Sequence, residues 1–280
     1  MVSGLLIGGI FSLLSVGFSL TWGVMKVINI SHAAFGLLAS YIAYWGLNLY
    51  GFDPILSLIL SIPLLFITGL FIHRFLIQQI TRSKDIIVAS MILTFGLAIV
   101  LENIMLLSWT PDERLITTSY SSRAIFLGDV VIRVSNLIGF LLSLIGISII
   151  YLFLYHTKTG KAVRATWQEP EGAILQGINL QKVSMIAFGL AIASSGAGGV
   201  AMVYMYSFNP SAHNLWLIFL FLVVIVGGVG SVLGSAVAGL LIGLITGLSN
   251  AFFPMQWINV LLFGLLMIIL LLKPEGLFRR

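Results

Sequence analysis

Residues 137–154 read LIGFLLSLIGISIIYLFL, a run of eighteen positions without a charged side chain. The run is apolar on every face of a helix, as expected for a helix that lies inside lipid. Two further runs of the same kind cover Leu215–Val226 and Val260–Leu272. A membrane barrel would instead show short segments in which apolar and polar residues alternate. The sequence therefore predicts an all-α integral membrane protein.

The composition of the whole chain leads to the same class. Hydrophobic residues make up 59% of the 280 residues and charged residues only 8%, whereas a soluble domain carries about 25% charged residues. Soluble enzymes and disordered proteins are therefore excluded. The absence of cysteine excludes disulfides, thiolate zinc sites and cysteine nucleophiles. We expect a single transmembrane domain over 1–280, with no catalytic residue, metal site, cofactor or nucleic acid partner of its own.

Apolar segments long enough to cross a bilayer recur along the chain and predict a polytopic bundle of about eight to ten helices. The candidate spans are 4–23, 33–50, 55–73, 86–108, 137–155, 183–206, 215–230, 234–253 and 257–272. Several of the 29 glycines have the small-xxx-small spacing that lets helices approach closely in lipid. These pairs are Gly4 and Gly8, Gly230 and Gly234, Gly239 and Gly243, and Gly243 and Gly247. The alternative is that glycine is simply common in membrane helices.

Basic residues are distributed unequally between the two sets of connections. Alternating spans place eleven of the 14 basic residues on one side: Lys26, Arg74, Arg82, Lys84, Lys158, Lys161, Arg164, Lys182, Lys273, Arg279 and Arg280. The other side receives only Arg114, Arg123 and Arg133. Lys and Arg favour the cytoplasmic side of a membrane. We therefore expect the N-terminus outside and the C-terminus in the cytoplasm.

The longest connection on the predicted outer side is 109–136. It is rich in Thr, Tyr, Val and Ile, and its Gly128-Asp129 pair is typical of a tight turn. A small hairpin on the membrane surface is predicted here. The segment is either a docking ledge for an external partner or a passive connector.

The segment 21–36, TWGVMKVINISHAAFG, interrupts the apolar pattern between the first two spans. Asn29, Ser31 and His32 lie close together in it, and irregular backbone near a membrane is tolerated where it lines a cavity or is covered by protein. We expect Ser31 to cap a helix that begins near His32. The free N–H groups of that helix start would suit the carboxylate of an amino acid. The alternative is an ordinary cytoplasmic turn.

Glu102 and Asn103 lie inside the apolar segment 86–108. An ionisable group at that depth costs about 3 kcal/mol on insertion scales and normally faces the interior of the bundle. Three roles are open: Glu102 and Asn103 line a substrate pathway, Glu102 pairs with a neighbouring helix, or Glu102 couples transport to protons.

The segment 156–182 is polar, predicted to be cytoplasmic, and contains helix signals. Pro170 between Glu169 and Glu171 is well placed in a first helical turn, and Gly177 is suited to end a short helix. This segment is either a docking element for a cytoplasmic partner or a solvated loop. The glycine-rich stretch 226–239 predicts a tight turn or close packing, because it lacks the Lys of a phosphate-binding loop. The full phosphate-loop pattern G-x-x-x-x-G-K-[ST] is absent from the chain.

Together these motifs resemble the permease subunits of bacterial branched-chain amino acid ABC transporters. Residues 22–33 are similar to the family pattern Y-G-x-x-x-x-I-N-x-A-H-G and keep Gly23, Ile28, Asn29 and His32. The stretches 227–234 and 273–278 are similar to the family's G-G-x-G-S-x-x-G and R-P-x-G-L-F. The cytoplasmic segment is similar to the family's docking loop through Gly160, Ala162, Arg164, Ala165, Glu171, Ala173, Gly177, Ile178 and Asn179.

The resemblance implies a role and a set of partners. It implies an importer subunit in the bacterial inner membrane that works by alternating access with a second permease chain, either a different chain or a second copy. Two cytoplasmic ATPases would bind ATP and Mg, and an external substrate-binding protein would deliver the cargo. The docking residues would be Gly160, Arg164, Glu169, Glu171, Ala173 and Gly177. Urea or a short amide is an alternative cargo, and a stand-alone ion-coupled transporter with Glu102 as its coupling acid is the rival class.

Overall fold

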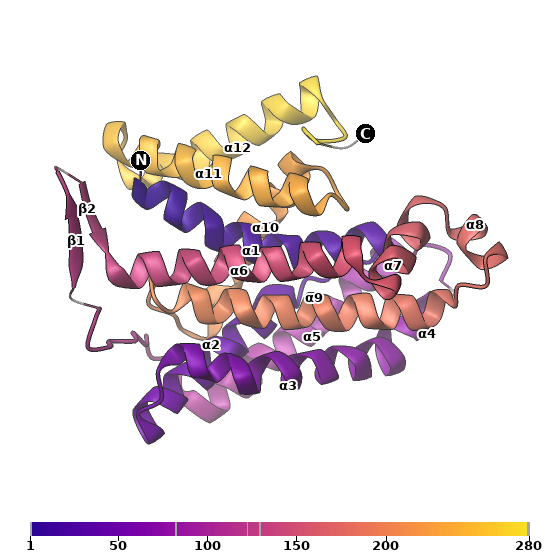
Figure 1. Ribbon diagram of the computed structural model, residues 1–280, viewed down its shortest axis with the longest axis horizontal. Helices are drawn as coiled ribbons and strands as arrows, with labels where there is room; N and C mark the ends of the chain where they lie inside the picture. The colour runs from indigo at the N-terminus through magenta and orange to yellow at the C-terminus, as the bar shows by residue number, and fades with distance from the viewer. Residues whose placement is uncertain (1, 82, 122, 129, 279–280) are drawn as a thin grey trace.

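The computed structural model describes residues 2–81, 83–121, 123–128 and 130–278. Long helices run side by side and form one elongated bundle, with a two-stranded hairpin at one end and two short helices at the other (Figure 1). Four residues that enter the predictions of orientation and turn lie outside the described residues: Arg82, Asp129, Arg279 and Arg280.

The described elements follow in chain order. They are α1 (Val2–Met25), α2 (His32–Tyr50), η1 (Pro54–Leu56), α3 (Ser57–Ile72), η2 (His73–Ile77), α4 (Gln78–Ile80), α5 (Ile86–Trp109), β1 (Ala124–Leu127), β2 (Val130–Arg133), α6 (Val134–His156), α7 (Lys158–Gln168), α8 (Pro170–Leu175), α9 (Leu180–Met202), η3 (Pro210–Ala212), α10 (His213–Gly227), α11 (Val232–Phe252) and α12 (Met255–Leu272). The predicted class, a polytopic helical membrane protein, is confirmed.

Within the described residues, seven helices are long and apolar enough to cross a membrane. They correspond to seven of the nine predicted spans. The exceptions are α2, whose composition is more polar because it includes His32, Ser40 and Asn48, and α12, in which the stretch compared is Val260–Leu272. Both segments are nevertheless helical.

The centre of the bundle is formed by α1, α2 and α9. Most residues of α1 and α9 are buried inside the protein, whereas most residues of α3, α5 and α6 are partly or fully exposed on the outside of the bundle. The central helices are rich in Gly, Ala and Ser, and small side chains allow such close backbone contact within lipid.

The glycine pairs of α1 and α11 form one of these close contacts. A Cβ atom built on Gly243 would lie 2.3 Å from the Cα of Gly8, and one on Gly4 would lie 2.4 Å from the carbonyl oxygen of Gly243. Gly239 meets the Ser12 backbone in the same way. The packing role predicted from the small-xxx-small spacing is therefore confirmed for this helix pair.

The glycine-rich stretch after α10 forms the predicted tight turn. Gly228 and Gly230 adopt φ values of +90° and +83°, a region that favours glycine. Ser231 caps α11, because its Oγ accepts the N–H of Gly234 at 2.9 Å. The turn also brings Gly227 and Gly234 into backbone contact.

The segment 109–136 contains an antiparallel hairpin of β1 and β2. Ala124 faces Arg133 and Leu127 faces Val130, and β2 leads directly into α6. The hairpin marks one end of the bundle, here named the hairpin end (Figure 1).

The opposite end carries α7 and α8 and is here named the basic end (Figure 1). The direction in which each helix runs determines the end of the bundle at which each described basic residue lies. Those at the basic end are Lys26, Arg74, Lys84, Lys158, Lys161, Arg164, Lys182 and Lys273; those at the hairpin end are Arg114, Arg123 and Arg133. Which end faces the cytoplasm stays a prediction from this distribution.

Candidate functional site

The chain between α1 and α2 turns back into the bundle. α1 ends at Met25, Lys26 adopts a φ of +55°, and no helix is present from there to His32. The Nε2 of His32 lies 3.1 Å from the carbonyl oxygen of Leu14. Leu14 precedes the end of α1 by about 16 Å at the α-helical rise. α2 therefore begins deep inside the bundle and not at its end.

Two hydroxyl groups of α5 satisfy the backbone of this returning segment. Ser90 Oγ accepts the N–H of Ile28 at 3.1 Å, and Thr94 Oγ1 accepts the N–H of Ile30 at 2.9 Å. Thr94 also donates to the carbonyl oxygen of Ile28 at 3.0 Å. Inside a membrane, backbone groups outside a helix need such partners.

Sequence reasoning missed Ser90 and Thr94, although a signal for them exists. They are isolated hydroxyl residues in an apolar span, and they are four positions apart, so they lie on one face of the helix.

Asn29, Ser31 and His32 are completely buried. The Ser31 hydroxyl donates to Asn29 Oδ1 at 2.6 Å, so the prediction that this side chain caps α2 is wrong. The backbone at the start of α2 is instead held by α9, because Ser195 donates its hydroxyl hydrogen to the carbonyl oxygen of His32.

Two polar atoms of this break have no hydrogen-bond partner in the described part of the chain. They are Asn29 Nδ2 and His32 Nδ1. A buried polar group without a partner costs about 1–3 kcal/mol. The amide nitrogen is a donor and the imidazole nitrogen is a donor or an acceptor according to its tautomer, which suits a polar ligand group or water. No cluster of metal-ligating side chains occurs among the described residues.

Glu102 contacts residues other than those of the break between α1 and α2. Its Oε2 lies 3.1 Å from Nε2 of His213 at the start of α10, and its other oxygen accepts the hydroxyl of Ser211. Thr94, which holds the returning segment, precedes Glu102 on α5 by about 12 Å at the helical rise. The structure thus does not bring Glu102 together with Asn29, and the geometry favours the pairing role among the three considered.

Asn103 points away from the bundle interior. Its side chain is exposed, and its Nδ2 donates at 2.8 Å to the carbonyl oxygen of Ile99 in the same helix. It shares no contact with the break at Asn29 among the described hydrogen bonds.

A second polar cluster joins three connections at the hairpin end. The Asp53 carboxylate accepts the hydroxyls of Tyr120 at 2.5 Å and of Tyr204 at 2.9 Å. Burial raises the pKa of both phenols, so both stay protonated and act as donors at neutral pH. Sequence reasoning missed this cluster because its members come from connections far apart in the chain.

At the basic end, α7 is fastened to the ends of other helices. Arg164 Nε donates to the carbonyl oxygen of Leu154 at 3.1 Å, and its guanidinium lies 4.1 Å above the Tyr155 ring. A Cβ on Gly160 would lie 2.0 Å from the Phe153 carbonyl oxygen, so only glycine allows α7 to approach α6 this closely. The arrangement ties α7 to the last turn of α6.

Trp167 fastens α7 to the turn between α10 and α11. A Cβ on Gly230 would lie 2.7 Å from the Trp167 indole, and one on Gly23 near the end of α1 would lie 2.4 Å from the Gly230 Cα. A displacement of α7 would therefore also displace α1, α10 and α11.

The short helix α8 begins with Pro170 at its first position. Two residues after its last residue, Leu175, Gly177 adopts a φ of +76°, and the N–H of Ile178 bonds the carbonyl oxygen of Ala173 at 3.0 Å. This is the Schellman pattern of helix termination. The predicted residues divide by exposure: Ala173 is buried at 4%, whereas Glu169 and Glu171 are exposed.

Two apolar side chains of α8 that sequence reasoning missed are also exposed. Ile174 is 55% and Leu175 is 86% exposed. Their exposure on a polar segment marks a surface suited to a partner.

Comparison with known proteins now identifies the family. The family model described as "Branched-chain amino acid transport system / permease component" matches residues 1–271. The chain belongs to this permease family.

Three relatives of this permease illustrate its similarity. The high-affinity branched-chain amino acid transport system permease protein BraD of Pseudomonas aeruginosa is 27% identical over all of this chain and 95% of its own length. LivH of Escherichia coli K12 is 24% identical over all of this chain and 94% of its own length. A probable LivH of Methanocaldococcus jannaschii is 30% identical over 83% of this chain and 74% of its own length. No solved structure matches this chain.

Membership in the permease family confirms the function expected from the sequence, a permease component of a branched-chain amino acid ABC transport system. In such a system the ATPase resides in a separate subunit, and the family implies ATPase and binding-protein partners. The lack of a phosphate-binding loop in this permease agrees with that division of labour.

Proposed function

We propose that this chain forms one half of the membrane part of an importer for branched-chain amino acids. A second permease chain, either different or a second copy, completes the membrane part. Two cytoplasmic ATPases bind ATP and Mg, and an external protein delivers the substrate. The hairpin end faces outward and the basic end faces the cytoplasm, as the distribution of Lys and Arg supports.

The surface of α8 is the observation that carries the ATPase-docking part of the proposal. Exposed Ile174 and Leu175 offer apolar area, and Glu169 and Glu171 add negative charge beside it. Such a surface fits a groove with an apolar floor and basic rim on a partner.

The contacts of α7 would transmit a displacement of α8 by the ATPase to the membrane helices. A push on α8 moves α7, and Arg164 and Trp167 pass the displacement to α6 and to the turn between α10 and α11. α1 meets that turn through Gly23. Because packed helices move as rigid units, the bundle would rock between two orientations.

The break between α1 and α2 is the proposed substrate pathway. Asn29 and His32 hold polar atoms deep in the bundle that have no hydrogen-bond partner among the described residues, and Ser31 donates its hydroxyl hydrogen to Asn29. In one orientation of the helices these atoms would bind the charged groups of a zwitterionic substrate. Glu102 and Asn103, predicted as pathway residues, lie nearer the hairpin end, where Glu102 serves to join α5 to α10.

Leu175→Ser tests the docking surface, with Leu107→Ser as the matched control. Leu107 is 88% exposed on α5 near the hairpin end, so the control removes the same side chain at similar exposure. We expect Leu175→Ser, and also the double charge reversal of Glu169 and Glu171 to Lys, to reduce co-purification of the ATPase and leucine uptake by about tenfold. Normal association in both variants would overturn the docking assignment.

Labelling tests the orientation directly, because the chain contains no cysteine. Single variants Leu175→Cys and Phe126→Cys place a thiol on exposed positions of α8 and β1. A membrane-impermeant maleimide should label Phe126→Cys in intact cells and Leu175→Cys only after lysis. The reverse pattern would contradict the proposed orientation.

A further inference from the structure

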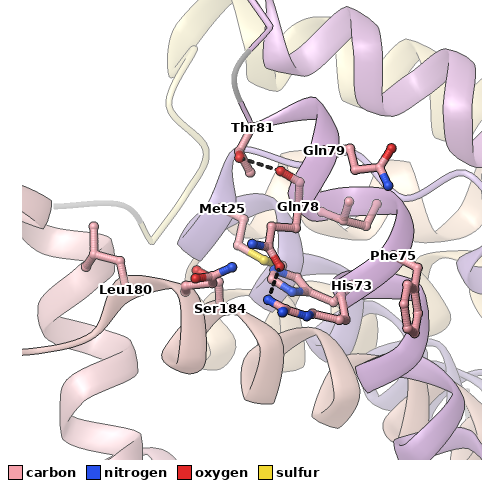
Figure 2. Close-up of a pocket in the computed structure, with 11 residues that line it drawn as sticks. Met25, His73, Phe75, Gln78, Gln79, Thr81, Leu180 and Ser184 are labelled. Carbon is pink, nitrogen blue, oxygen red and sulfur yellow. Dashed lines mark hydrogen bonds between the residues drawn. The ribbon is translucent and has the colours of Figure 1, made fainter.

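A cavity of about 850 Å³ opens at the basic end. Its walls are the end of α1, the segment from η2 to α4, and the start of α9. Figure 2 shows the side chains of Met25, His73, Gln78 and Ser184 converging on it, and Phe75 and Gln79 also belong to its lining. Gln181 and Arg74 complete its polar lining.

The charge of this cavity is positive and uncompensated. The only described hydrogen bond of the Arg74 side chain is to Gln78 Oε1 at 3.0 Å, and no described carboxylate lies within ion-pair distance of it. Its described lining contains no Asp or Glu. Lys26 and Lys182 directly adjoin lining residues in the chain and add to the positive field. The cavity therefore favours an anion.

His73 gives an independent indication of a ligand. It lines the cavity at 2% exposure, and its Nδ1 has no hydrogen-bond partner among the described residues. It begins η2, a single π-helical turn at the end of α3. An unpartnered buried nitrogen beside an open polar cavity is costly in free energy unless something binds there.

An apolar stripe runs along η2 and α3 from the cavity towards the hairpin end. It is formed by Leu64, Ile67, Phe71 and Phe75, which are 45%, 50%, 58% and 58% exposed. Their spacing of three or four residues places them on one face. The rings of Phe71 and Phe75 stack with centroids 6.0 Å apart. A polar, cationic cavity that opens onto an apolar stripe suits a ligand with an anionic head and a hydrocarbon tail.

We propose that this cavity binds the phosphate headgroup of an anionic membrane phospholipid. The phosphate oxygens accept hydrogen bonds from the Arg74 guanidinium and from the amides of Gln78 and Gln181, and one acyl chain lies along Phe75 and Phe71. Basic cavities between membrane helices are suited to anionic headgroups, because the surrounding low dielectric strengthens the charge interaction.

Binding to the purified full-length chain tests this assignment. The probes are nanodiscs of phosphatidylglycerol, nanodiscs of phosphatidylcholine and inorganic phosphate, and retained lipid is measured by native mass spectrometry with thermal unfolding as the second readout. We expect phosphatidylglycerol to bind the wild type, and Arg74→Gln to weaken that binding about tenfold or more, because a charge-assisted hydrogen bond is lost. Lys158→Gln, which removes a basic residue of α7 outside the cavity, is the matched control and should bind as the wild type does.

Phe75→Ala distinguishes a phospholipid headgroup from free phosphate as the ligand. We expect the phospholipid, whose acyl chain contacts Phe75, to bind this variant more weakly than the wild type, whereas free phosphate should bind both equally. If inorganic phosphate binds as tightly as the lipid and Phe75→Ala has no effect, the site is for free phosphate and the lipid assignment is overturned. Equal retention of phosphatidylglycerol and phosphatidylcholine, or unchanged retention in Arg74→Gln, would also overturn it.

Discussion

The imidazole of His32 reaches across to the middle of the preceding helix, with its Nε2 3.1 Å from the carbonyl oxygen of Leu14. Leu14 lies in the middle of α1, so the contact holds the first residue of α2 beside the middle of α1. The six residues between the helices are thereby forced into the bundle, where Ser90 and Thr94 satisfy their backbone. His32 is thus one of several side chains, with Ser90, Thr94 and Ser195, that hold the proposed pathway in place.

Replacing His32 with Leu should loosen this attachment. The loss of one buried hydrogen bond costs about 1 kcal/mol, which corresponds to a fall in melting temperature of about 2–4 °C for a chain of this size. Thermal unfolding in detergent measures the change. His156→Leu is the control, because His156 is exposed at the end of α6 and should leave the melting temperature unchanged. Equal melting of the wild type and His32→Leu would show that the contact does not hold α2.

Replacing Asn29 with Leu should reduce transport more than stability. The substitution removes both the unpartnered Nδ2 and the acceptor for Ser31, and we expect leucine uptake to fall by about tenfold or more. Uptake is measured in proteoliposomes with the ATPase and binding protein, and membrane insertion by immunoblot.

Asn103→Leu is the matched control for Asn29→Leu. Asn103 is an exposed membrane-helix asparagine whose one side-chain hydrogen bond among the described residues lies within α5, so uptake should stay close to that of the wild type. Full uptake by Asn29→Leu would remove Asn29 from the pathway.

Glu102 distinguishes the importer from an ion-coupled transporter. Gln at this position can still bond Ser211 and His213, so Glu102→Gln should change ATP-driven uptake by no more than about twofold. Glu102→Leu leaves the His213 side chain, which is 3% exposed, without its partner and should lower stability by about 1–3 kcal/mol. Uptake by the chain alone under a proton gradient, lost in Glu102→Gln, would establish the rival mechanism.

The crossing of α1 and α11 should not tolerate a methyl group. Gly243→Ala places a Cβ 2.3 Å from the Gly8 Cα and forces the helices apart, at a cost of about 1–3 kcal/mol. Gly96→Ala on α5 is the control, since nothing lies within 4 Å of its Cβ position and the helix propensity of Ala favours stability. Thermal unfolding compares the two variants. A Gly243→Ala protein as stable as Gly96→Ala would rule out close packing at this crossing.

Local patterns were sufficient for some of these features. Gly177 ends α8 and Gly228 begins a turn because each adopts a positive φ, a property of glycine that the sequence displays. The glycine pairs of α1 and α11 were likewise visible from their spacing. Their partners were not, because spacing on one helix does not say which other helix it meets.

The capping prediction for Ser31 shows where local reasoning fails. Position and residue type were both suitable for a cap, yet the hydroxyl bonds Asn29 because the segment is enclosed by α1, α5 and α9. The same enclosure made Ser90 and Thr94 functional neighbours of a segment more than sixty residues away. Neither contact follows from hydrophobic periodicity.

The sequence by itself determined the class of this protein, the places where its helices lie and its resemblance to the permease family. Long uncharged runs and the unequal distribution of basic residues between the connections are enough to determine these features, because transfer into lipid depends on composition along the chain. Only the tertiary structure decided that α2 begins within the bundle, that Glu102 pairs with His213, and that Arg74 and Gln181 share a cavity. These depend on side chains from distant segments meeting in space, where each buried polar group takes whichever partner the packing provides.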